Sequence, residues 1–340
     1  MNQIDQAFLS DAQVRDVLSR IANLRALVIG DICLDRWCIY DPSLAEASRE
    51  TGIPRIAVIS YEVTPGAGGT VSNNLVAMGV RDVGVLGVLG DDGPAFELRR
   101  ALESRNVDTS YLVTSAETQT FTYTKYLNVS TGEEDLPRTD FVNVNPWSSD
   151  VEAALVSQLR VAAAEADVIL VSDQAETEVG GVVTAAVRKT LAEIGRDAPR
   201  KTVWVDSRMR PEHFRGVIVK VNQEEAEMAC DRLQIKRDFS LLCAQTHSPL
   251  FLVTHGGDGV DIYSASGANS VSTERVEDPV DICGAGDSFS AGAAMALAAT
   301  GDPVLAARFG NLVASITIMK RGTGTASPDE ILDQAELNRR

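Results

Sequence analysis

Short apolar runs that alternate with helical patterns constrain the fold of this chain more than any other feature of its sequence. Strands of a parallel sheet look like this when helices cover both faces. The predicted strands are Ala26–Ile29, Val83–Val88, Val168–Val171, Thr202–Val205, Val217–Val221 and Leu250–Thr254, and the predicted helices between them are Val71–Met78, Pro94–Asn106, Asp150–Ala164, Gly181–Ile194 and Gln223–Asp231. The pattern predicts a doubly wound, three-layer α/β/α sandwich with a mostly parallel central sheet.

Two stretches interrupt this rhythm, at about residues 37–63 and 118–144. In the second stretch, Phe121, Tyr123 and Lys125 alternate with other side chains at the two-residue period of a strand. Both stretches follow elements that could deliver them to the same end of the main sheet. We therefore expect a small β-sheet that covers the cleft there as a lid.

The rest of the chain divides simply. Val14, Val17 and Ile21 are spaced as on an amphipathic helix, so residues 1–24 are expected to form a helical extension ahead of the first strand. Residues 25–330 are expected to form one large domain together with the lid, and residues 331–340 a C-terminal tail. Because the chain ends at residue 340, we expect no second domain after this tail.

Charge and cysteine content restrict the classes of partner and the compartment. A net charge of −17 argues against a nucleic-acid or anionic membrane surface, which would need a basic patch. The five cysteines form no C-x-x-C pair, and the N-terminus has no long apolar run. These observations predict reduced thiols in a cytoplasmic protein. The three histidines are scattered and suggest neither a metal site nor a catalytic triad.

The segment from Asp281 to Phe289, D-I-C-G-A-G-D-S-F, carries the clearest chemical signal. Two glycines at the start of a helix let backbone N–H groups point at an anion such as a phosphoryl group. Asp287 follows directly and could accept a proton from an attacking hydroxyl, which suits phosphoryl transfer. The alternative is an aspartate that only caps a helix after a glycine turn.

This segment resembles the second signature of the ribokinase-like (phosphofructokinase-B, PfkB) carbohydrate kinases. The resemblance implies that Asp287 is the catalytic base, that Gly284, Ala285 and Gly286 form an anion hole, and that Asp281 helps to hold a monovalent cation such as K⁺. Asp35, in the segment Gly30–Arg36, matches the aspartate that grips sugar hydroxyls. A carboxylate can accept two hydroxyl hydrogen bonds. The alternative for Asp35 is a turn residue at a strand end.

The remaining matches follow the order of the family along the chain. The glycine-rich turn at Gly66, Gly68 and Gly69 resembles the first signature, which approaches the sugar, although Thr70 replaces the usual Asn. On the nucleotide side, the resemblance implies contacts to ATP and implies Mg²⁺ bound through water by Glu225. The implied nucleotide contacts are Asn222, Thr254, Gly256, Gly259, Asn311 and Gly322. Asn222 and Glu225 also read as a capping box, and no Walker A loop occurs.

Within the family the chain is most similar to the heptose 7-phosphate kinases. That group implies sugar contacts from Arg36, Lys125 and Asp173, and the cations that could meet a substrate phosphate are Arg36, Lys125, Arg138 and Arg208. Gln174 and Glu176 depart from the group, and Glu176 would repel a phosphate.

Two classes of function follow from these matches. The first is an ATP-dependent kinase acting on a small sugar or sugar phosphate, and the alternative is a catalytically weak sugar- or nucleotide-binding sensor on the same fold. Exposed edges of the lid strands predict a homodimer.

Overall fold

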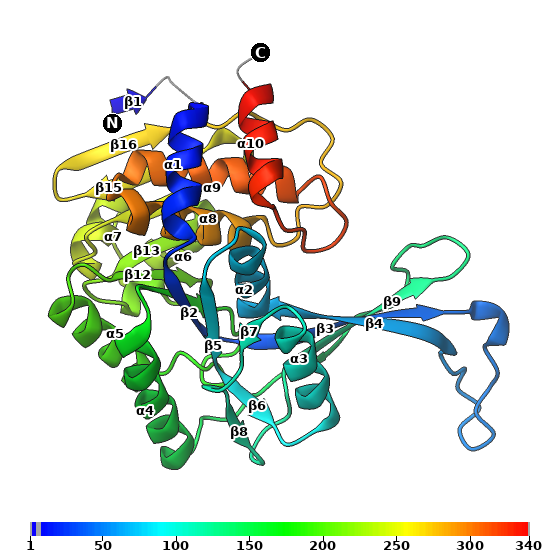
Figure 1. Cartoon of the computed structure of the whole chain (residues 1–340). Helices are drawn as coiled ribbons and strands as arrows, with labels where there is room; N and C mark the ends of the chain where they lie inside the picture. Colours follow the sequence, from blue (N-terminus) through cyan, green and yellow to red (C-terminus); the bar gives the residue numbers. More distant parts are fainter. Residues whose placement is uncertain (1, 5–7, 339–340) are drawn as a thin grey trace.

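A computed structural model describes residues 2–4 and 8–338, and its centre is a ten-stranded sheet (Figure 1). In spatial order the strands are β1 (Asn2–Ile4), β16 (Gly267–Val271), β15 (Val260–Ser264), β14 (Phe251–Thr254), β13 (Ile218–Asn222), β12 (Thr202–Ser207), β11 (Val168–Asp173), β2 (Arg25–Gly30), β5 (Asp82–Leu86) and β7 (Val107–Asp108). All neighbours are parallel except β15, which is antiparallel to both β14 and β16. The carboxyl ends of the parallel strands therefore share one edge, where α/β sheets place their ligands.

Helices cover both faces of this sheet and enclose two apolar cores. One face carries α1 (Asp11–Ile21), α2 (Gly68–Ala77), α3 (Gly93–Glu103), α8 (Ala285–Thr300), α9 (Pro303–Thr317) and α10 (Pro328–Leu337). The other carries α4 (Ser149–Glu165), α5 (Ala185–Asp197), α6 (Gln223–Leu233) and α7 (Phe239–Thr246). The predicted three-layer sandwich is confirmed. In the described part of the chain, no helix is both long and apolar enough to cross a membrane.

The predicted strands are confirmed with small shifts at their ends, but one predicted helix begins later than expected. The pattern predicted a helix from Gly181, whereas α5 begins at Ala185 with Thr184 as its N-cap. The backbone N–H of Val182 instead donates to the buried carboxylate of Asp31, 2.9 Å away. This long-range hydrogen bond holds the preceding residues in a loop, and helical periodicity does not reveal it.

The chain leaves the main sheet at Gly30 and begins the lid two residues later. The lid sheet has the order β10 (Thr139–Phe141), β9 (Thr122–Asn128), β3 (Ile32–Tyr40) and β4 (Val58–Ala67). Strands β3, β4 and β9 extend away from the body in Figure 1. Strands β6 (Val88–Gly90) and β8 (Val113–Ser115) form a separate pair. The lid begins earlier than predicted, because β3 follows β2 almost without a turn.

Both ends of the described chain pack on the same side of the body. Helix α1 lies beside α10 (Figure 1). Residues 331–337 were predicted to be part of a tail, but they continue helix α10, whose Ile331 and Ala335 are buried. Lid side chains such as Ile53, Ile59 and Tyr61 are exposed, and the predicted homodimer would depend on such a surface.

Gly30 should be intolerant of any side chain. Its φ is +142°, and a Cβ there would overlap the carbonyl oxygen of Ser172 on the neighbouring strand β11. We expect Gly30→Ala to lower the free energy of unfolding by about 3 kcal/mol, measured by chemical denaturation. Gly93→Ala is the matched control, because a Cβ at that position meets nothing within 4 Å. Equal stability of the two variants would contradict this account of the junction.

Candidate active site

A cavity of about 130 Å³ lies between the lid and the carboxyl ends of the central strands. Its walls come from the lid, from the loops after β11 and β12, and from the first turn of α8. The lining residues are Cys33, Asp35, Trp37, Ala67, Thr70, Tyr123, Lys125, Arg138, Gln174, Glu176, Arg208, Cys283, Gly284, Asp287 and Thr323. Segments from the whole length of the chain therefore meet here.

The alternation of β3 decides which of its side chains enter this cavity. Asp35 and Trp37 point inward, while Arg36 lies on the opposite face of the strand. There Arg36 pairs with Glu97 of α3 and lies over the Tyr61 ring, 5.6 Å from its centroid. The predicted substrate contact from Arg36 is therefore not supported, because a residue next to an inward-facing one on a strand must face outward.

Two cations of the lid are held over aromatic rings in the cavity wall. The Nζ of Lys125 lies 4.4 Å from the Trp37 ring centroid, and the guanidinium of Arg138 lies 4.8 Å from the Tyr123 ring centroid. Strand register explains the first contact, since Trp37 of β3 pairs with Lys125 of β9. Each cation also has an acidic partner: Arg138 forms a 2.7 Å ion pair with Asp140, and Lys125 lies 3.7 Å from Glu134. The rings hold both cations in the cavity wall.

The predicted substrate glycines serve the packing of the cleft. Gly66, Gly68 and Gly69 are buried, and a Cβ at Gly66 would collide with the carboxylate of Asp35. Their neighbours Ala67 and Thr70 line the cavity instead. The glycines thus let β4 and α2 approach β3, and Gly66 makes room for the Asp35 carboxylate that lines the cavity.

Asp173 does not reach the cavity, contrary to the substrate role predicted for it. It is 1% exposed, and its carboxylate accepts hydrogen bonds from the Ser207 hydroxyl at 2.6 Å and from the Arg210 guanidinium at 2.9 Å. Such a closed, buried ion pair leaves no room for a sugar hydroxyl. From the same loop, Gln174 and Glu176 line the cavity, and Glu176 lies 3.8 Å from Arg208.

The first turn of α8 carries the predicted base. Gly284 precedes the helix in the left-handed conformation, with φ of 78°, and has no side-chain cap. The first N–H groups of a helix lack intrahelical acceptors, so this turn presents donors and the positive end of the helix dipole. Burial, with the nearby charge of Asp206, raises the pKa of Asp287 to about 7, although Lys220 and Arg208 oppose the rise.

Asp206 and Lys220 escaped the sequence prediction, although they lie directly beneath this turn. They are cross-strand partners on β12 and β13, and their ion pair, with 2.8 Å between Nζ and Oδ2, is buried. The sequence held one signal for this pair: Lys220 interrupts the apolar run from Val217 to Val221, which was predicted to be a buried strand. A charged residue in such a run needs a partner, but the sequence does not name it.

A second cavity, of about 480 Å³, lies on the other side of the first turn of α8. It is lined by four of the predicted nucleotide residues, Thr254, Gly256, Gly259 and Asn311 of α9, together with Ile282, Ala285 and Gly286. Gly322 is not among its lining residues. It lies beside Trp37 instead, and its N–H donates to Asp281 at 3.0 Å.

Asn222 and Glu225 form the capping box at the start of α6, with reciprocal hydrogen bonds of 2.7 and 2.8 Å. Burial and Asp206 raise the pKa of Glu225, so a divalent cation beside it would relieve repulsion between two carboxylates. The site therefore fits water-mediated Mg²⁺.

Asp281 uses its two carboxylate oxygens to accept N–H groups of Cys283 and Gly322, which ties two loops together. Within the described residues, no three acidic, His or Cys side chains form a direct metal cluster.

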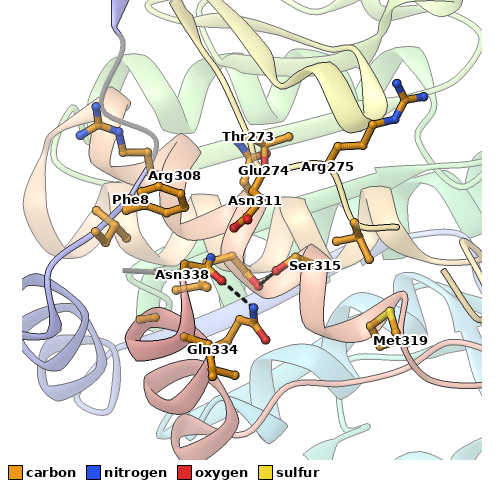
Figure 2. Close-up of a pocket in the computed structure, with 15 residues that line it drawn as sticks. Phe8, Thr273, Glu274, Arg275, Arg308, Asn311, Ser315, Met319, Gln334 and Asn338 are labelled. Carbon is orange, nitrogen blue, oxygen red and sulfur yellow. Dashed lines mark hydrogen bonds between the residues drawn. The ribbon is translucent and has the colours of Figure 1, made fainter. Parts of the chain in front are cut away.

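A third cavity, of about 490 Å³, adjoins the second and shares the segment 273–276, Asn311 and Ser315 with it (Figure 2). In its wall, Gln334 of α10 donates a hydrogen bond to Asn338, the C-cap of that helix, and Figure 2 marks this bond, which is 2.6 Å long. The Nδ2 of Asn311 is buried without a hydrogen-bond acceptor among the described residues. A group with a free acceptor at the junction of these cavities would satisfy it.

The described architecture is the ribokinase fold. Ribokinase from Arabidopsis thaliana, solved with ribose and ATP, gives a TM-score of 0.66 at 18% identity and covers 92% of this chain and 99% of its own. Phosphofructokinase-2 from Escherichia coli, solved with potassium, gives a TM-score of 0.68 at 18% identity, with 93% and 100% covered. At such identities the likeness establishes the fold alone.

Sequence comparison establishes the family. The pfkB family carbohydrate kinase model matches residues 25–330, so the chain belongs to this family and is a sugar kinase. The bifunctional protein HldE of Pelobacter propionicus is 28% identical over 330 residues, which cover 95% of this chain and 66% of that relative. The chain thus spans just under two thirds of the relative's length.

The raised pKa of Asp287 predicts a pH-dependent gain in stability for Asp287→Asn. The ordinary pKa of an aspartate is 3.8 and the folded value is about 7, so ionisation destabilises the folded state progressively between these values. The melting temperature of the variant should exceed that of the wild type by an amount that grows from pH 5 to about 7 and is constant above. Asp197→Asn, at an exposed aspartate, should show no such growth. A pH-independent difference for Asp287→Asn would contradict the shift.

Proposed function

We propose that this kinase transfers the γ-phosphoryl group of ATP to a hydroxyl of a sugar phosphate, with Asp287 as the base. One observation carries the proposal: residues 282–287 form a wall shared by the two cavities. Ile282, Ala285 and Gly286 face the larger cavity, and Gly284 and Asp287 face the smaller one. A phosphoryl group passing between them would travel past the first turn of α8.

The chemistry follows from this placement. The acceptor hydroxyl, oriented by Asp35, forms a bond to the γ-phosphorus while the bond from phosphorus to the β,γ-bridging oxygen of ATP breaks. Asp287 takes the hydroxyl proton, and ADP leaves. The first-turn N–H groups stabilise the negative charge on the transferring group. Mg²⁺, held through water near Glu225, would neutralise charge on the nucleotide phosphates.

The nucleotide would occupy the larger cavity. The buried Nδ2 of Asn311, which lacks an acceptor in the described chain, fits a nitrogen or oxygen acceptor of a base. Kinases of this family use ATP and Mg²⁺. The potassium in the Escherichia coli phosphofructokinase-2 structure supports a monovalent cation in this chain as well, next to the loops that Asp281 ties together.

The charges of the smaller cavity favour an anionic sugar. Lys125 and Arg138 are stacked on aromatic rings and pair with Glu134 and Asp140, and Arg208 lies 3.8 Å from Glu176. A substrate phosphate could take over these cations, which makes Glu176 a weaker repulsive element than the sequence suggested. The relatives named HldE make heptose 7-phosphate the first candidate. The same Glu176–Arg208 contact also fits the alternative function, a sensor whose cavity is already partly neutralised.

ADP release from Mg-ATP should occur with one member of a panel of sugars and sugar phosphates that includes heptose 7-phosphate. Asp287→Asn should lower kcat by about 10²- to 10⁴-fold, because asparagine has nearly the same shape as aspartate but cannot accept the hydroxyl proton. Asp197→Asn should retain the wild-type rate. Turnover that survives in Asp287→Asn would exclude Asp287 as the base. Binding of ATP or sugar without any turnover would favour the sensor.

Lys125→Met and Arg138→Met should each raise KM for a phosphorylated substrate by about tenfold with little change in kcat, because binding is lost equally in the ground and transition states. The matching unphosphorylated sugar should be much less affected. Arg160→Met, at an exposed ion pair with Glu193 on α5, is the control. If both sugars lose affinity alike, the two cations do not contact a phosphate.

A further inference from the structure

A buried ion pair lies between the sheet and the catalytic turn of α8. Asp206 of β12 and Lys220 of β13 are directly paired in the parallel register, and they are 6% and 4% exposed. The Asp206 carboxylate accepts hydrogen bonds from Lys220 Nζ at 2.8 Å and from the Ser290 hydroxyl of α8 at 3.0 Å. The pair therefore joins two central strands to the helix that carries Asp287.

The fold alone does not explain charges at this position. The preceding cross-strand pair on the same face, Trp204 and Ile218, is apolar and belongs to the core, where Trp204 contacts the ring of Phe289. A buried ion pair is commonly no more stable than an apolar pair of similar volume. An apolar pair could thus continue this layer, so the charges call for another explanation.

The ammonium group lies close to the turn that is proposed to receive the phosphoryl group. A Cβ placed on Gly286 would lie only 3.1 Å from Lys220 Nζ, so glycine at this position lets the ammonium approach the helix backbone. A lysine ammonium carries three donors and a full positive charge. Its charge adds to the partial positive charge of the helix N-terminus.

Asp287 lies among charged and titratable groups from several elements. These are Asp206 of β12, Lys220 of β13, Arg208 after β12, Asp35 and Cys33 of β3, and Cys283 in the loop before α8. Asp206 and Asp35 disfavour ionisation of Asp287, while Lys220 and Arg208 favour it. Of the two cations, Arg208 is half exposed, whereas Lys220 is buried and held by an ion pair. Lys220 is therefore the cation whose position is fixed.

We propose that Lys220, held in place by Asp206, is a positioning residue that favours the ionised form of Asp287 and supplies fixed positive charge beneath the anion hole. Lys220 acts through the turn of α8 and does not touch the sugar. Asp206 orients the ammonium and limits its effect, because its own charge acts on Asp287 in the opposite sense. This proposal rests on the proposed function of Asp287 as the base.

The first test needs no substrate. In each of four backgrounds (wild type, Lys220→Met, Asp206→Asn, and the double variant), the melting temperature is compared with and without Asp287→Asn from pH 5 to 9. The pH at which this difference stops growing reports the folded-state pKa of Asp287. It should move up by about one pH unit in Lys220→Met, move down in Asp206→Asn, and return toward the wild-type value in the double variant.

The second test uses turnover. The acidic limb of the kcat/KM profile should shift in the same directions in the same backgrounds, and kcat on the plateau should fall about tenfold or more in Lys220→Met. The double variant should keep the low plateau, since it also lacks the positive charge. Lys201→Met is the matched control, because that partly buried lysine precedes β12 and hydrogen-bonds carbonyls at the end of α4.

The outcomes separate the two proposals. If the stability profiles shift but no sugar is phosphorylated, the coupling of Lys220 to Asp287 stands and the proposed function fails. If turnover depends on Asp287 but neither profile moves in Lys220→Met, the ion pair is only structural and the inference is wrong. If a single variant folds poorly, the double variant serves instead, because it leaves no buried charge unpaired. A low kcat plateau in the double variant supports the proposal, and a wild-type plateau contradicts it.

Discussion

The buried carboxylate of Asp31 holds together the parts from which the cleft is built. Its two oxygens accept three backbone N–H groups, those of Gln174, Ala175 and Val182, at 2.7 to 2.9 Å, and its carbonyl accepts the N–H of Gly68 at the start of α2. One residue thus fixes the exit of the lid from the main sheet, the first turn of α2 and the loop after β11. Burial and the charge of Asp173 raise the pKa of Asp31 to about 6, and the three backbone N–H groups oppose this rise because they stabilise the ionised form.

Carboxylates and cations lie close together in the cleft next to Asp31, although the protein as a whole is strongly acidic. Carboxylates reach it from β3, from α8 and from the loop after β11, and cations reach it from β9, from the segment before β10 and from the loop after β12. A charge shielded from water acts more strongly on its neighbours. The identity of each neighbour of Asp287 therefore matters more than the net charge of −17. This is why a chain that should repel anions overall can still offer a local site for phosphate groups.

In the lid, the alternation of side chains along a strand decides which residues can reach the cavity. Asp35 and Arg36 are adjacent in sequence, yet the two-residue period of β3 sends Asp35 into the cavity and Arg36 to Glu97 on the outside. A family resemblance proposed both residues as substrate contacts, and strand geometry separates them. For Asp173, the distant partners Ser207 and Arg210 decide the outcome, because they close its carboxylate off from the cleft.

By itself, the sequence determined the layered α/β architecture, the existence of the lid and the place of Asp287 after a glycine turn, because buried strands, amphipathic helices and turn glycines leave local patterns of apolar spacing and residue type. Only the tertiary structure decided that residues 282–287 divide two cavities, that Asp31 holds the loop after β11, and that Asp206 and Lys220 lie beneath the first turn of α8. Those relations join residues far apart in the chain. Their energies depend on burial and on distances between charges, and neither is defined until the sheet is assembled.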